Sequence, residues 1–130
     1  RRWFGFDDGL YSGARLLEIL SAVANPSAML NALPESVSTP EQHIQMQEGE
    51  PHTLIAALQK SAKFEGATDV MTIDGLRVEY ADGFGLARPS NTTPVVVMRF
   101  EADSEEAIQR IQSEFKAVLL AAKPEAKLPF

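Results

Sequence analysis

A seven-residue break between two apolar segments carries the residues best suited to bind an anion: Arg88-Pro89-Ser90-Asn91-Thr92-Thr93-Pro94. The arginine offers a planar fork of N–H donors that matches phosphate or carboxylate. The hydroxyl and amide side chains add donors, and backbone N–H groups in a tight loop form anion-binding concavities. The same residue types also form a capped turn, in which Asn and Ser bond their own backbone. The segment alone leaves both interpretations open.

The two histidines, His43 and His52, are a weaker candidate for a site. Both stand close in sequence to acidic residues, namely Glu41, Glu48 and Glu50. Imidazole and carboxylate groups bind metals, but this spacing matches no metal motif. We therefore expect a solvated acidic loop here.

The pair Asp7-Asp8 could act as catalytic or metal-binding carboxylates, but helix capping explains it more simply. The glycine-containing stretches "GFDDG" and "ADGFG" are not GxGxxG loops, so a dinucleotide fingerprint is absent. No serine has a base evident beside it in the sequence. From the residues alone, the chain offers one good anion-binding loop and no complete active site.

Composition limits the classes of function. The 130 residues carry a net charge of −6, and no basic stripe of the kind that marks nucleic-acid binders is visible. There is no cysteine, which excludes disulfides and thiolate chemistry and is compatible with the cytoplasm, where we expect the protein. No apolar run approaches the roughly 18 residues that span a bilayer. The first residue is Arg, which indicates either processing or a piece of a longer protein.

The elements that position the loop follow from periodicity. Residues 7–24 have apolar side chains at helical spacing, with Asp7 or Asp8 as the cap, and Asn25-Pro26 opens a short second helix. The stretch "PESVSTP" (34–40), polar with proline at both ends, predicts a linker. Trp3, Phe4 and Phe6 lie before it, in a segment too apolar for a solvated arm.

After the linker the pattern changes to strands. "HIQMQ" and "DVMTI" predict two strands, with a helix opened by Pro51 between them. The dipeptides Asp74-Gly75 and Asp82-Gly83 predict hairpin turns around an alternating strand, "LRVEY". "FGLAR" and "VVVMRFEA" flank the seven-residue break, and a final helix follows Asp103, which has capping-box spacing to Glu106. The order β-α-β-β-β-β-α over 41–122 predicts an α+β domain, an antiparallel sheet with two helices on one face.

Four stretches together resemble the C-terminal part of the α-D-phosphohexomutases, the group that contains bacterial phosphomannomutase/phosphoglucomutase: "RWFGFDDGLYSGARLLEIL", "STPE", "DGLRVEYADGFGLARPSNTTPVVVMRFEADSEEA" and "LPF". The resemblance covers nearly the whole chain, in order. It implies that residues 1–35 are the helical tail of a third domain, 36–41 a hinge or linker, and 42–130 the fourth domain. It also implies a TATA-box-binding-protein-like fold for that fourth domain.

The resemblance further implies a function for the loop. In that family the fourth domain binds the substrate's phosphate and closes the cleft, which places substrate-phosphate contacts on Arg88, Ser90, Asn91, Thr92 and Thr93. Many family members carry Glu at the position of Thr93. The implied reaction interconverts hexose 1-phosphate and 6-phosphate, of mannose or glucose, through a bisphosphosugar.

The rest of the implied machinery lies outside this chain. The family's catalytic serine loop, metal loop and sugar-selecting loop would all precede Arg1. The resemblance therefore implies Mg²⁺ and glucose 1,6-bisphosphate as cofactor and activator of the parent enzyme, with neither bound here, and no catalytic or metal-binding residue in this piece. The implied partners are the phosphosugar and domains 1–3, with no nucleic acid and no membrane. A non-catalytic α+β domain for protein contact is the alternative.

Overall fold

The computed structural model describes residues 4–130, and contacts divide the chain into two units between Pro34 and Glu35. Each unit is described by itself. Arg1, Arg2 and Trp3 begin the segment predicted to be the tail of a third domain, and they lie outside the described residues. Within residues 4–130, no helix has both the length and the apolar character needed to cross a bilayer.

The first unit contains two helices, α1 (Gly9–Ser21) and α2 (Pro26–Asn31). Both predicted caps are confirmed: Asp8 accepts the backbone N–H of Tyr11 at 2.9 Å, and Asn25 accepts that of Ala28 at 3.0 Å. Neither helix contains a buried residue among the described positions. Phe4 and Phe6, in the segment that the sequence marked as too apolar for a solvated arm, are exposed, and so are Leu10 and Leu17 of α1.

The second unit is built on a six-stranded antiparallel sheet, which confirms the predicted fold class. Its strands are β1 (Val37–Ser38), β2 (Gln42–Gln45), β3 (Asp69–Met71), β4 (Leu76–Tyr80), β5 (Gly83–Pro89) and β6 (Val95–Ala102). The order is β1-β6-β5-β4-β3, and β2 pairs with β6 next to β1. Strands β5 and β6 therefore lie at the centre, joined by residues 90–94.

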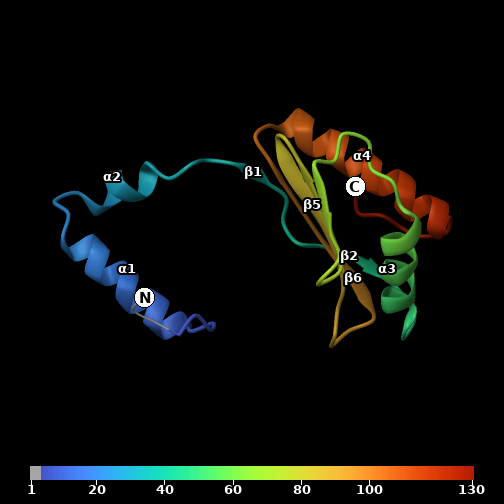
Figure 1. Ribbon diagram of the computed structural model, residues 1–130, viewed down its shortest axis with the longest axis horizontal. Helices are drawn as coiled ribbons and strands as arrows, with labels where there is room; N and C mark the ends of the chain where they lie inside the picture. The colour runs from blue at the N-terminus through green and yellow to red at the C-terminus, as the bar shows by residue number, and fades with distance from the viewer. Residues whose placement is uncertain (1–3) are drawn as a thin grey trace. The chain divides into compact units, whose positions relative to one another are not determined.

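Helices α3 (Glu50–Ser61) and α4 (Glu105–Ala122) cover one face of this sheet (Figure 1). The alternation of buried and exposed residues along β4 places Leu76, Val78 and Tyr80 toward the helices, as the sequence predicts. Phe115 of α4 packs edge-to-face on Phe100 of β6, with ring centroids 5.3 Å apart. Burial of these side chains is the main source of stability of the unit.

The sheet and α4 approach each other most closely at Gly85 of β5. A Cβ atom at this position would lie 2.9 Å from Cζ of Phe115 and 3.0 Å from Cγ2 of Ile111. Glycine is thus required by space, because any side chain would push α4 away from the sheet. The C-terminal segment after α4 packs on the same core through Phe130, whose ring centroid lies 5.2 Å from that of Phe100.

Strand β1 falls within the predicted linker, residues 36–41, and was not predicted. Val37 pairs with Ala102 and Ser38 with Glu101. Thr39 donates its backbone N–H to the carbonyl of Phe100 at 2.9 Å. The beginning of this segment is therefore held along β6, while its function as a hinge stays a prediction.

Several local boundaries differ from those read in the sequence: the first helix is Gly9–Ser21 and not 7–24, and Gly83 pairs with Tyr80, so the turn before β5 is Ala81-Asp82. Helix α4 is capped by Ser104, which accepts the N–H of Ala107 at 3.2 Å, and not by Asp103. Four residues, 72–75, separate β3 from β4, so Asp74-Gly75 is part of a longer turn. Arg88 and Pro89 continue β5, because they pair with Val97 and Val96 of β6, and the break shortens to residues 90–94.

Candidate functional site: the loop between β5 and β6

The loop between the two central strands is organised around one hydroxyl oxygen. Oγ of Ser90 accepts the backbone N–H groups of Thr92 at 3.3 Å and Thr93 at 3.2 Å. The same oxygen lies 3.0 Å from the hydroxyl of Thr93. The loop closes through Ser90 N–H to the carbonyl of Val95 at 3.0 Å. Backbone N–H groups that converge on one oxygen are the arrangement found in anion-binding loops, and also in serine-capped turns.

A small hollow of about 80 Å³ opens beside this loop. Its other wall is the start of α3, which the sequence did not place there. Gly49, the residue before α3, has φ +80° and offers no side-chain cap. The lining residues come from these two segments only: Glu48, Gly49, Pro51, His52, Ser90, Asn91, Thr92, Thr93 and Pro94.

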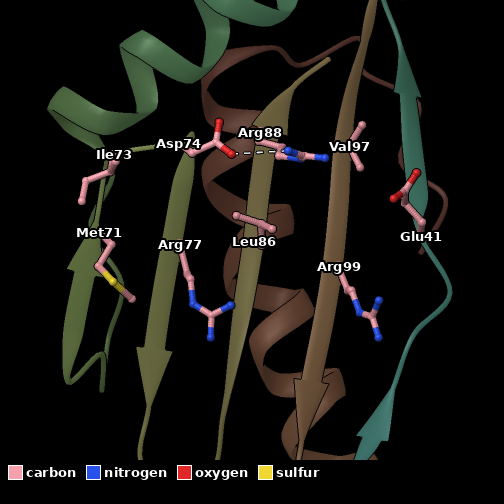
Figure 2. Close-up of a pocket in the computed structure, with 9 residues that line it drawn as sticks. All are labelled: Glu41, Met71, Ile73, Asp74, Arg77, Leu86, Arg88, Val97 and Arg99. Carbon is pink, nitrogen blue, oxygen red and sulfur yellow. Dashed lines mark hydrogen bonds and ion pairs between the residues drawn. The ribbon is translucent and has the colours of Figure 1, made fainter. Parts of the chain in front are cut away.

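The side chain of Arg88 lies on the face of the sheet that the helices leave open (Figure 2). There its Nη1 is 3.3 Å from Oδ2 of Asp74, in the turn before β4. The guanidinium lines a depression of about 410 Å³ and not the hollow beside the loop. Arg88 is only two residues from Ser90 in sequence. Its guanidinium nevertheless points to the carboxylate of Asp74 and not to the loop.

Two further arginines share this open face. The register aligns Arg77 of β4 and Arg99 of β6 with Leu86 of β5, so each is a diagonal neighbour of Arg88. Arg77 donates to Glu79 at 2.6 Å and its guanidinium carbon lies 3.6 Å from the ring centroid of Phe84. Within residues 4–130, the Arg99 guanidinium forms no hydrogen bond or ion pair. The three arginines are interspersed with carboxylates on this face, since Glu41 and Asp74 line the same depression and Glu79 pairs with Arg77.

The structure therefore unites part of the predicted site. Ser90, Thr92 and Thr93 form one hydrogen-bonded cluster, and Asn91 lines the same hollow. Arg88 stands apart, on the open face. Sequence analysis missed His52 and Asp74. The packing of α3 places His52 beside the loop, and the turn before β4 places Asp74 beside Arg88, and neither position follows from a sequence motif.

The helix start beside the loop is held by a charged cluster at Glu50. One carboxylate oxygen accepts the backbone N–H of Gln47 at 2.9 Å, and the other lies 3.1 Å from Nζ of Lys123. The backbone hydrogen bond first, and then the lysine, lower the pKa of Glu50. Elsewhere, burial raises the pKa of Tyr80, and its hydrogen bond to Glu114 adds to the effect.

The histidines do not form a shared site. Nε2 of His43 lies 2.9 Å from Oε1 of Glu41, while His52 lines the hollow beside the loop. Among the described residues, no three His, Cys, Asp or Glu side chains are grouped as metal ligands. No residue of this part of the chain is therefore assigned to a metal.

Comparison with known proteins agrees with this architecture. Residues 43–118 match the family described as "Phosphoglucomutase/phosphomannomutase, C-terminal domain". The chain is 66% identical over 119 residues to the phosphoglucomutase of Neisseria meningitidis serogroup B, which covers 91% of this chain and 26% of that protein. It is 52% identical over 130 residues to the phosphomannomutase/phosphoglucomutase of Pseudomonas putida, covering 99% of this chain and 28% of that one.

A solved structure supports the fold as well. The crystal structure of a phosphoglucomutase/phosphomannomutase family protein from Burkholderia thailandensis matches with a TM-score of 0.86 at 64% identity. The match covers 99% of this chain and 27% of that one, so the chain spans about a quarter of the length of these relatives. On the family match and these similarities, the chain belongs to the phosphoglucomutase/phosphomannomutase C-terminal domain family.

Proposed function

We propose that this chain is the phosphate clamp of a hexose-phosphate mutase. The observation that carries the proposal is the clustering of donors in one short loop: the N–H groups of Thr92 and Thr93 converge on the hydroxyl oxygen of Ser90, two residues in sequence after Arg88. In the proposed complex a phosphate oxygen accepts N–H groups that the Ser90 hydroxyl accepts here, and Arg88 turns from Asp74 to the phosphate and supplies most of the attraction. Membership of the family favours this function over a domain used only for protein contact.

In the proposed reaction the parent enzyme interconverts hexose 1-phosphate and 6-phosphate, of glucose or mannose, through a bisphosphosugar. Arg88 binds the phosphate that is not being transferred, and Ser90, Asn91, Thr92 and Thr93 add hydrogen bonds. Holding one end of the sugar fixes where the other end lies, which lowers the entropic cost of reaching the transition state. The bisphosphosugar carries a phosphate at each end, so either end can bind at Arg88 and the loop.

The phosphoryl donor and the metal belong to the upstream part of the parent enzyme in this proposal. Mg²⁺, when bound there, supplies charge stabilisation for the transferred phosphoryl group. The resemblance gives this chain no catalytic residue, so we expect it to bind the substrate phosphate without turning it over. Its contribution to catalysis is to position the substrate and to exclude water when the cleft closes.

A titration tests this function. Glucose 1-phosphate and mannose 1-phosphate are added separately to the ¹⁵N-labelled chain, and backbone amide signals are followed. We expect the signals of residues 88–93 to move with each phosphosugar and to stay unmoved with unphosphorylated glucose. Unmoved signals with both phosphosugars, or an equal response to glucose, would show that the loop does not recognise phosphate.

A further inference from the structure

The turn that carries Asp74 is held in place independently of the loop. Gly75 has φ +88°, and a Cβ atom there would lie 2.6 Å from the carbonyl oxygen of Ala87 and from Cβ of Arg88. The turn therefore packs directly on the backbone of Arg88, an approach that only glycine allows. From the other side of the sheet, Nε2 of Gln59 in α3 donates to the carbonyls of Thr72, at 3.2 Å, and Gly75, at 2.5 Å.

This packing presents a carboxylate to the arginine. Oδ2 of Asp74 lies 3.3 Å from Nη1 of Arg88, as the dashed line in Figure 2 marks. Leu76 pairs with Ala87, so the register places Gly75 opposite Arg88 and Asp74 one residue beyond. The backbone of the turn therefore holds the short side chain of Asp74 within reach of the Arg88 guanidinium.

A carboxylate and a phosphate compete for the same donors. Both bind a guanidinium through its planar fork, and a guanidinium has a fixed set of N–H groups. A phosphate dianion at Arg88 also meets repulsion from a carboxylate held close by. The side chain of Asp74 is largely exposed, so its bond to Arg88 is weak enough to exchange with a ligand.

We propose that Asp74 holds Arg88 on the open face of the sheet and competes with the ligand's phosphate for its guanidinium. The inference rests on the proposed function, since it assigns a residue that sets the affinity of that same site. Arg88 exchanges its carboxylate partner for phosphate when the ligand arrives and returns to it when the ligand leaves. A mutase that must release and rebind its intermediate gains from such an exchange, because the unliganded arginine stays partnered while the phosphate is released.

The test measures binding of inorganic phosphate to the 130-residue chain by the amide shifts of residues 88–93. In Asp74→Asn the competitor is neutral, and we expect the dissociation constant to fall about threefold. The gain should shrink as sodium chloride is added, because exposed charges are screened. The gain in phosphate affinity should disappear when Asp74→Asn is combined with Arg88→Ala, because Asp74 affects phosphate only through Arg88.

Asp69→Asn is the matched control. It makes the same change of charge on the neighbouring strand β3, but its Oδ1 accepts the backbone N–H of Val70 at 2.8 Å and contacts no arginine among the described residues. We expect wild-type affinity for this variant. Phosphate binding in Asp74→Asn that is no tighter than in wild type, or an equal gain in Asp69→Asn, overturns the inference.

The outcomes also separate this inference from the function on which it rests. If Arg88→Ala binds phosphate as well as wild type, the clamp itself is wrong, and the function of Asp74 is wrong with it. If Arg88→Ala weakens phosphate binding while Asp74→Asn leaves it unchanged, the proposed phosphate site at Arg88 holds, and only the competition by Asp74 is wrong. A second readout needs no ligand: the Nε–H signal of Arg88 should move in Asp74→Asn and return in Asp74→Glu, and a signal unmoved in Asp74→Asn overturns the inference.

Discussion

The hydroxyl oxygen of Ser90 lies 3.2 Å from the backbone nitrogen of Thr93 and accepts its N–H group. This bond, with its counterpart from Thr92, gives the loop its shape before any ligand is present. We therefore expect Ser90→Ala to weaken phosphate binding about five- to tenfold, while the free energy of unfolding changes by about 1 kcal/mol or less. Phosphate titration and urea denaturation check the two effects.

Ser113→Ala is the control for that variant, because the Ser113 hydroxyl donates to the carbonyl of Gln109 on the exposed side of α4. It removes a hydroxyl of the same kind away from the loop and should leave phosphate affinity unchanged. An Ser90→Ala variant that binds phosphate as tightly as Ser113→Ala would show that the hydroxyl does not organise the site.

Gly85→Ala should destabilise the second unit by about 2 kcal/mol, because the new methyl group would overlap the ring of Phe115. The ring is fully buried and packed against Phe100, so it has no space into which to move. Urea denaturation measures the effect. At Gly13 in α1 a Cβ atom would meet nothing within 4 Å, and Gly13→Ala should leave unfolding of the second unit unchanged. Equal urea denaturation curves for the two variants would contradict the close packing of Gly85 against Phe115.

Glu50→Gln should change how stability depends on pH. The pKa of Glu50 is lowered from its ordinary value of 4.5 in the folded chain, so the ionised form stabilises the fold above that value. This stabilisation is lost as the pH falls through the lowered pKa. The variant should therefore be less stable than wild type at about pH 7, and the difference should shrink toward about pH 3. A difference that stays constant with pH would contradict the linkage.

Hydrogen exchange tests the predicted hinge at residues 36–41. The amide of Thr39 is bonded to Phe100, and Val37 and Ser38 pair with β6, so we expect protection at the beginning of the segment. A hinge requires that the rest of the segment exchange faster than α4, whose buried face includes Ile111, Phe115 and Leu119. Protection equal to that of α4 throughout residues 34–41 would rule out the hinge.

The features predicted correctly from sequence depend on neighbours along the chain. Asp8 and Asn25 cap helices through bonds to residues three positions later, and the alternation in β4 reflects a single strand with one buried face. Such signals need no knowledge of the fold. The α+β class followed from them, because the order of elements limits how they pack.

The features that were missed depend on contacts between distant residues. Strand β1 has two residues and exists only because Val37 and Ser38 pair with the end of β6. The assignment of the α4 cap to Asp103 failed for a smaller reason, since Ser104 is an equally good cap one position later. The positions of His52 beside the loop and Asp74 beside Arg88 depend on the sheet register and on the packing of α3, which no local pattern contains.

The dissociation constant of glucose 1-phosphate for Arg88→Ala, measured beside that for Arg99→Ala, tests the clamp most directly. Both arginines lie on the open face, on neighbouring strands, and both changes remove one positive charge. A charged hydrogen bond accounts for about tenfold or more in affinity, so Arg88→Ala should bind at least about tenfold more weakly than wild type. Arg99→Ala should stay within about twofold. Equal losses in the two variants would mean that the general charge of the face attracts the ligand, and would contradict a clamp built on Arg88.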